Sequence, residues 1–155
     1  MAIKCIAIGN RIMGDDSIGI VVLERIASKL QNSNIKVILG ETDSYYSLSR
    51  VDSGDFLFII DATYYDIEPG KVTFTPLQDI MNRGRSIFSQ HEPSLIHELR
   101  FSGEDMDGYL IGIEINEISY SLELSGILRN RITYICEDVC NFIFQFINKN
   151  DVGNK

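Results

Sequence analysis

Three segments of the chain carry side chains that can bind a metal ion or move a proton. Asp16 lies in a glycine-containing loop behind the first apolar run, Asp61 ends the most apolar run, and His91 precedes a proline suited to start a helix. Carboxylates and an imidazole suit a divalent transition metal. Three protein ligands would leave coordination positions open to a second molecule. The residue types therefore indicate an incomplete metal site.

Each of these side chains also has a purely structural interpretation. Asp15 would cap the following helix, and Asp16 would complement the helix dipole. Asp61 could accept hydrogen bonds from the next turn, while His91 could be solvated and His97 structural. A second acid beside a cap exceeds what capping needs, and a carboxylate at the mouth of a buried strand is costly without a partner. We therefore favour a chemical role for Asp16, Asp61 and His91.

The loop that contains Asp16 does not have the pattern of a nucleotide-binding loop. Its glycines are five residues apart, at Gly9, Gly14 and Gly19, unlike the dinucleotide-binding fingerprint or the P-loop. Two carboxylates at a helix N-terminus would also repel a phosphate group. The loop is therefore acidic and is not expected to bind a phosphate group.

The segments that must position these residues alternate between strand and helix patterns. Short apolar or alternating runs predict strands at 3–8, 35–40, 56–60, 71–75 and 109–115. Helical spacing predicts long helices at 18–30 and 132–146, and shorter ones at 45–51 and 93–99. This order predicts one α/β domain of three layers, with a twisted, mainly parallel sheet of about five strands flanked by helices on both faces. We expect residues 1–149 to form the domain and 150–155 to be a frayed polar tail.

The composition excludes several classes of protein. The 155 residues are 45% hydrophobic and 23% charged, which predicts a folded core, and the net charge of −8 argues against binding to nucleic acid or to an anionic membrane. An odd number of cysteines is not a disulfide framework, and we expect Cys5, Cys136 and Cys140 to be reduced and non-catalytic. No signal peptide or membrane span is visible. We expect a monomer in the cytoplasm.

The same segments resemble the hydrogenase maturation proteases, the endopeptidases that process the large subunits of nickel–iron hydrogenases. The resemblance spans about residues 3 to 145. Its strings are Ile8-Gly9-Asn10, Met13-Gly14-Asp15-Asp16-Ser17-Ile18-Gly19, Ile59-Ile60-Asp61-Ala62, Pro69-Gly70, Ser89-Gln90-His91-Glu92, Ile111-Gly112-Ile113-Glu114 and Ser121-Leu122-Glu123-Leu124-Ser125.

This resemblance implies a single α/β domain in which Asp16, Asp61 and His91 contact nickel. The nickel belongs to the substrate, because it has already been inserted into the hydrogenase large-subunit precursor. The protease then removes a short C-terminal extension. A metal can polarise the scissile carbonyl or activate a water, and Asp16 or Asp61 could instead act as a general base. The sequence leaves these alternatives open.

Two other classes of function remain as alternatives. A receiver-like or magnesium-dependent phosphotransfer domain also combines an acidic pair with a later aspartate, here Asp15, Asp16 and Asp61. A non-catalytic nickel-binding maturation factor would use the same ligands without cutting. Precursor cleavage, labelling of Asp61 by acetyl phosphate, or metal binding with neither distinguishes the three.

Overall fold

The computed structural model describes residues 2–82, 95–96, 98–99 and 106–153. Its strands are β1 (Ile3–Ile8), β2 (Lys36–Glu41), β3 (Phe56–Thr63), β4 (Val72–Pro76) and β5 (Asp107–Glu114). Its helices are the 3-10 turn η1 (Gly14–Ser17), α1 (Ile18–Asn32), α2 (Ser44–Ser49), α3 (Leu77–Asn82) and α5 (Gly126–Gly153). Within the described ranges, no helix combines the length and the apolar content that crossing a bilayer requires.

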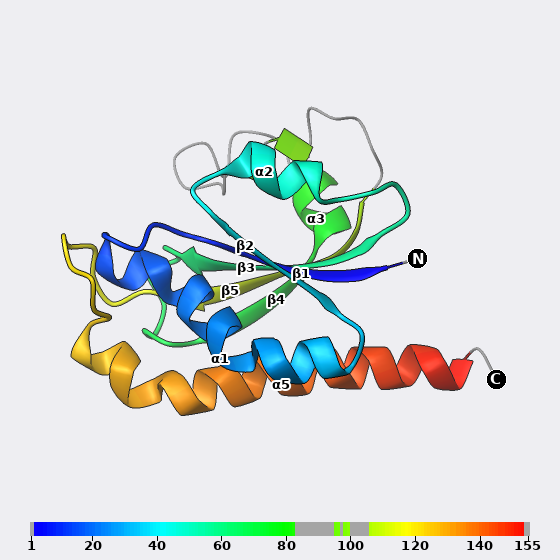
Figure 1. Cartoon of the computed structure of the whole chain (residues 1–155). Coiled ribbons are helices and arrows are strands. Elements are labelled where there is room, and N and C mark those ends of the chain that lie inside the picture. The colour runs from blue at the N-terminus through cyan, green and yellow to red at the C-terminus, as the bar shows by residue number, and fades with distance from the viewer. Residues whose placement is uncertain (1, 83–94, 97, 100–105, 154–155) are drawn as a thin grey trace.

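The strands form one five-stranded sheet in the order β2-β1-β3-β5-β4 (Figure 1). Strands β2, β1, β3 and β5 run parallel to one another, and β4 pairs antiparallel with β5 at the edge of the sheet. The carboxyl ends of β1, β3 and β5 therefore meet at one edge of the sheet, where open α/β sheets bind their ligands. The predicted α/β fold, its three layers and its mainly parallel sheet are confirmed.

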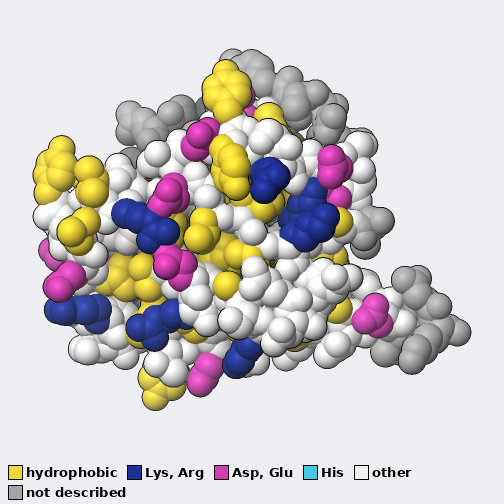
Figure 2. Space-filling model, viewed as in Figure 1, with side chains coloured by type: hydrophobic (Ala, Val, Ile, Leu, Met, Phe, Trp, Pro, Cys, Tyr) yellow, Lys and Arg dark blue, Asp and Glu magenta, His cyan; other side chains and the backbone are white. Residues whose placement is uncertain are grey.

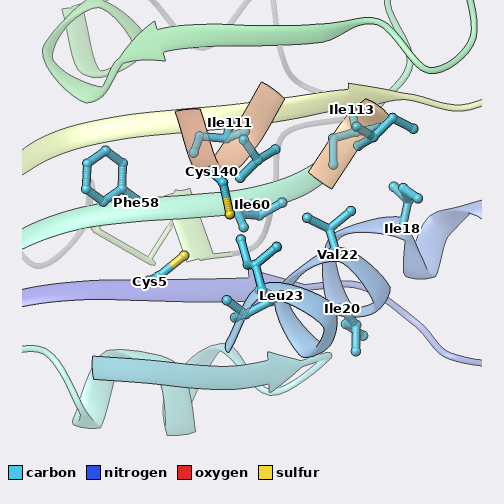
Figure 3. Packing of buried hydrophobic residues seen from close by; sticks show 14 of the residues in the cluster. Cys5, Ile18, Ile20, Val22, Leu23, Phe58, Ile60, Ile111, Ile113 and Cys140 are labelled. Carbon is cyan, nitrogen blue, oxygen red and sulfur yellow. The ribbon is translucent and has the colours of Figure 1, made fainter. Parts of the chain in front are cut away.

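Helices cover both faces of this sheet, which makes every residue of β3 buried. On one face α1 and α5 pack over alternate strand residues, among them Cys5, Phe58 and Ile111 (Figures 1 and 3). On the other face lie α2, α3 and the helical residues 95–96 and 98–99, over the intervening positions such as Ile6 and Ile59. The central strand β3 is thus continuously apolar from Phe56 to Ile60 because neither of its faces meets water.

The structure differs from the sequence-based prediction in three main respects. Strand β3 continues past Asp61 to Thr63, because it pairs with β5 up to the Thr63–Glu114 pair. Helix α3 follows the edge strand directly and has no counterpart in the prediction. Helix α5 continues to Gly153, through residues expected to lie in a frayed tail. Polar residues can extend a helix that is already nucleated, since each further residue adds one hydrogen bond.

A buried ion pair joins the amino end of β1 to the loop before β3. The Nζ atom of Lys4 lies 2.5 Å from Oδ2 of Asp55 and 3.1 Å from Oδ2 of Asp52. Burial alone would lower the pKa of Lys4, but its hydrogen bonds to the two aspartates raise the pKa above its ordinary value. Burial would likewise raise the pKa of Asp55, but the Lys4 ammonium and backbone N–H groups bring it below the ordinary value. The pair is therefore a charged feature of the folded state.

We expect this pair to make the fold sensitive to acid. An aspartate whose pKa is lowered on folding stabilises the protein above its unfolded pKa of about 3.9, and that contribution is lost as the pH falls through the folded pKa. The contribution of Lys4 is present below its unfolded pKa of about 10.4 and is lost as the pH rises through the folded pKa. Lys4→Met leaves Asp55 buried without its cation, so the free energy of unfolding at pH 7 should fall by about 3 kcal/mol.

Urea unfolding of wild type and Lys4→Met between pH 2 and pH 7 checks this. The acid-dependent loss of stability should be smaller in the variant than in wild type. Lys36→Met, at the exposed position that pairs with Lys4 in β2, is the control and should leave the unfolding free energy unchanged. Equal stabilities of Lys4→Met and wild type would show that the pair contributes nothing.

Candidate active site

Glycines bring the turn that carries Asp16 directly onto the end of the sheet. A Cβ atom at Gly9 would lie 2.3 Å from the carbonyl oxygen of Asp16, and one at Gly19 would lie 2.7 Å from that of Ile60. Gly14 has a φ of +56°, a conformation that few residues other than glycine adopt. Close backbone packing thus explains the glycines at 9 and 19, and the positive φ explains the one at 14.

Asp16 is half-buried, and two fixed donors hold its carboxylate. The backbone N–H of Asn10 donates to Oδ2 at 2.9 Å, and the hydroxyl of Tyr64 donates to Oδ1 at 2.5 Å. Burial raises the pKa of Tyr64, and the carboxylate it faces raises it further. The hydroxyl therefore stays protonated and serves as a donor. Hydrogen bonds to a charged acceptor are short and strong, so they orient the Asp16 carboxylate.

Asp61 is buried near the carboxyl end of β3, on the side of the sheet that faces α3. Its Oδ1 accepts a hydrogen bond from the N–H of Ala62 at 2.7 Å. Burial raises the pKa of Asp61 well above its usual range; the Ala62 N–H opposes this, and the negative charge of Asp16 adds to it. The two carboxylates are therefore electrostatic neighbours. A carboxyl group with a raised pKa can carry a proton near neutral pH or lose it to an arriving cation.

Asp15 has a different role from the one predicted. The cap positions of η1 and α1 carry no side-chain hydrogen bond, so Asp15 does not cap either helix. It is buried, and its Oδ2 accepts from the N–H groups of Asn116 and Glu117 at 3.0 and 3.1 Å. Ser125 donates its N–H to Oδ1 at 2.7 Å and its hydroxyl to Oδ2 at 2.8 Å. Asp15 therefore anchors both ends of the loop that follows β5.

Glu114 anchors the neighbouring loop in the same way, a role that no pattern in the sequence indicates. The hydroxyl of Thr63 donates to its Oε1 at 2.8 Å, and the N–H groups of Tyr65 and Asp66 donate to its two oxygens at 2.9 and 3.0 Å. The buried carboxylate thereby fixes the loop that begins with Tyr64. The position of Tyr64 directly after a buried strand was the only sequence signal that it reaches the site.

The third predicted ligand cannot be placed with the other two. His91 lies outside the described residues, as do its neighbours in the segment 89–93 and His97. Within the described part of the chain, no group of three or more His, Cys, Asp or Glu side chains is arranged to hold a metal ion. The structure places Asp16 close enough to Asp61 for its charge to raise the pKa of Asp61, and the convergence of the two with His91 on one metal ion stays a prediction.

The three cysteines lie away from this edge of the sheet. Cys5, Cys136 and Cys140 are free thiols, as predicted. Burial raises the pKa of each of them. Because the thiolate is the reactive form, their environments disfavour nucleophilic chemistry.

Comparisons with known proteins point to one family. The family model of the hydrogenase maturation proteases of the HycI type matches residues 20–144, a span that contains Asp61 and His91 and begins after Asp16. Protein FrxA of Pyrococcus furiosus is 31% identical over 139 residues, which cover 84% of this chain and 97% of FrxA. Protein MJ0253 of Methanocaldococcus jannaschii is 27% identical over 95 residues, 60% of this chain, and the match spans only 62% of that relative's length.

The fold agrees with these matches. The structure of the hydrogenase maturating endopeptidase HybD from Escherichia coli superimposes with a TM-score of 0.70 at 20% identity, covering 94% of this chain and 93% of HybD. At that identity the superposition establishes the fold, and the match to the family model establishes the relationship.

Proposed function

We propose that this chain, which belongs to the hydrogenase maturation protease family, removes the C-terminal extension of a nickel–iron hydrogenase large-subunit precursor after nickel insertion. The observation that carries the proposal is the pair Asp16 and Asp61. The two carboxylates come from different segments at the carboxyl edge of the sheet, and the charge of Asp16 adds to the raised pKa of Asp61. Asp16 accepts hydrogen bonds from two donors, and Asp61 accepts one from the N–H of Ala62.

In this proposal Asp16, Asp61 and His91 contact the nickel that the precursor carries. Carboxylate oxygens and an imidazole nitrogen are suitable ligands for such an ion, and three of them leave positions for ligands of the precursor. The cation would also relieve the repulsion between the two carboxylates and favour the charged form of Asp61. The protease therefore gains binding energy from the metal only when the precursor is loaded.

The reaction is hydrolysis of one peptide bond. The oxygen of a water bonds to the scissile carbonyl carbon, the C–N bond breaks, and a proton reaches the leaving amine. The nickel of the substrate can polarise the carbonyl or activate the water. Alternatively, Asp16 or Asp61 takes the proton from the water as a general base, because both carboxylates lie at the edge where the metal would bind.

We expect the enzyme to cleave nickel-loaded precursor and to leave nickel-free precursor intact. Specificity follows from metal occupancy, because an unloaded precursor lacks the group that the carboxylates recognise. The assay incubates the purified protein with both forms and follows the loss of the C-terminal extension by intact-mass spectrometry. Equal cleavage of the two forms would refute nickel recognition while leaving the peptidase activity in place.

The same assay addresses the alternative functions. The phosphotransfer alternative requires Asp15 and Asp16 to act as an acidic pair, but the Asp15 carboxylate accepts its hydrogen bonds from the loop 116–125. A non-catalytic nickel-binding factor would bind loaded precursor without shortening it. Binding without any mass change would therefore favour that alternative.

A further inference from the structure

We propose that four exposed apolar side chains next to the candidate site dock the hydrogenase precursor, an inference that rests on the proposed function. This apolar rim consists of Ile12, Ile118, Tyr120 and Leu122. Their exposed fractions are 52%, 52%, 86% and 82%. A cluster of large apolar side chains exposed this far commonly marks a surface that another protein covers.

The rim is built on two loops whose backbones hold each other in place. Met13 and Ser121 form an isolated parallel bridge. Ser121 donates its N–H to the carbonyl of Ile12 at 3.0 Å, and its own carbonyl accepts the N–H of Gly14 at 2.9 Å. Asp15 fixes the loop of Ile118, Tyr120 and Leu122 at both ends. The rim is therefore presented by a preorganised backbone, which lowers the entropic cost of binding.

The rim is continuous with the site. Ile12 lies four residues before Asp16 in the sequence. Asp15, next to Asp16, accepts a hydrogen bond from Glu117 and so ties the loop of Ile118, Tyr120 and Leu122 to η1. Figure 2 shows hydrophobic side chains gathered at the end of the molecule where, in Figure 1, β3 and β5 end and α5 begins. A precursor whose scissile bond reaches Asp16 would therefore cover the rim.

The exposed hydrophobic side chains as a class are concentrated near this end of the strands. Among the residues that the structure describes, most of them lie in segments that follow the carboxyl ends of parallel strands. These are Ile12, Tyr45, Tyr46, Tyr65, Ile67, Ile118, Tyr120 and Leu122, whereas Leu39, Ile127 and Tyr134 lie within β2 and α5. This distribution indicates one binding face, because exposed hydrophobic residues without a function are expected to be scattered over the surface.

Charge distinguishes a precursor from a second copy of this chain as the occupant. Exposed Glu117 lies on the same loop as the rim, as does Glu123, which is paired with Arg129 at 3.5 Å, and the whole chain has a net charge of −8. A second copy would bring the same acidic loop against this one and be repelled. The complementary partner is a precursor surface with apolar residues flanked by lysine or arginine.

The test compares three variants with wild type, two of them in cleavage of nickel-loaded precursor and the third in its rate of association with that precursor. The double variant Tyr120→Ser, Leu122→Ser removes the most exposed half of the rim. It should raise KM at least about tenfold, since a few aromatic and apolar anchors carry most of the energy of an interface, and should change kcat less than twofold. Tyr134→Ser, which removes a 70% exposed tyrosine from α5, is the matched control and should behave as wild type. Glu117→Lys should slow association at low salt.

The outcomes separate this inference from the proposed function. Unchanged KM in the double variant, with wild-type cleavage intact, would overturn the docking role alone. If wild type does not cleave the loaded precursor, the proposed protease activity fails, and binding of the precursor measured by calorimetry then decides the docking role. Equal binding by wild type and double variant, or a wild-type dimer in sedimentation that the double variant loses, would overturn it.

Discussion

Asp16→Asn is expected to abolish cleavage of nickel-loaded precursor while the protein stays folded. Asparagine has the same shape as aspartate and keeps one oxygen that can accept from Tyr64 or from the N–H of Asn10. It lacks the negative charge and the second acceptor oxygen that a metal ligand at this position supplies. We expect kcat/KM to fall at least about a hundredfold, because loss of residues that merely support metal ligands costs 10- to 100-fold.

The neighbouring tyrosine provides a graded comparison. Tyr64→Phe removes the hydroxyl that orients Asp16 and keeps the charge of the carboxylate. Its kcat/KM should fall about tenfold, the range expected for a partner of a metal ligand. Circular dichroism and thermal unfolding check that both variants fold. An Asp16→Asn variant that cleaves within threefold of wild type would exclude Asp16 from the site.

The parts of this structure that local pattern controls could be predicted from the sequence. The strand and helix runs of β1, α1 and α5 were found because burial on one or two faces leaves a period in the residues themselves. The burial of Asp61 agrees with the reason for singling it out, a carboxylate at the end of an apolar strand, while its role as a ligand stays a prediction. The short helix α3 was missed, since six residues beside an edge strand carry too little periodicity to be distinguished.

The residues that control the loops of the site could not be predicted, because their partners are distant in the sequence. Asp15 looked like a helix cap from its neighbours, yet its donors are more than a hundred residues away, in the loop 116–125. The loop that Glu114 holds is likewise about fifty residues earlier. A buried carboxylate that satisfies backbone N–H groups leaves no local pattern. Only the fold shows that Asp15 has a structural role, which separates it from the adjacent Asp16 that we propose as a ligand of the nickel.

Because Asp15 has a structural role, its substitution should have a large effect on stability, whereas the substitution of Asp16 should act on cleavage. Asp15→Asn should lower the free energy of unfolding by about 3 kcal/mol, because an amide nitrogen would face backbone N–H donors and leave buried groups unsatisfied. Asp16→Asn, the same substitution one residue later, should leave that free energy within about 1 kcal/mol of wild type, since Asp16 is only half-buried. Urea unfolding of the two variants measures the difference directly.

Hydrogen exchange identifies which part of the chain is destabilised in Asp15→Asn. In wild type the amides of Asn116, Glu117 and Ser125 donate to the Asp15 carboxylate and should therefore be protected. In Asp15→Asn they should exchange faster, whereas the amides of β1 and β3 should lose protection only through the lower global stability. Because the same loop carries Tyr120 and Leu122, its release should also raise KM for the precursor. If Asp15→Asn were as stable as wild type and kept these amides protected, the loop would be held by its own packing and by the Met13–Ser121 bridge, and Asp15 would have to be reconsidered as a member of the site.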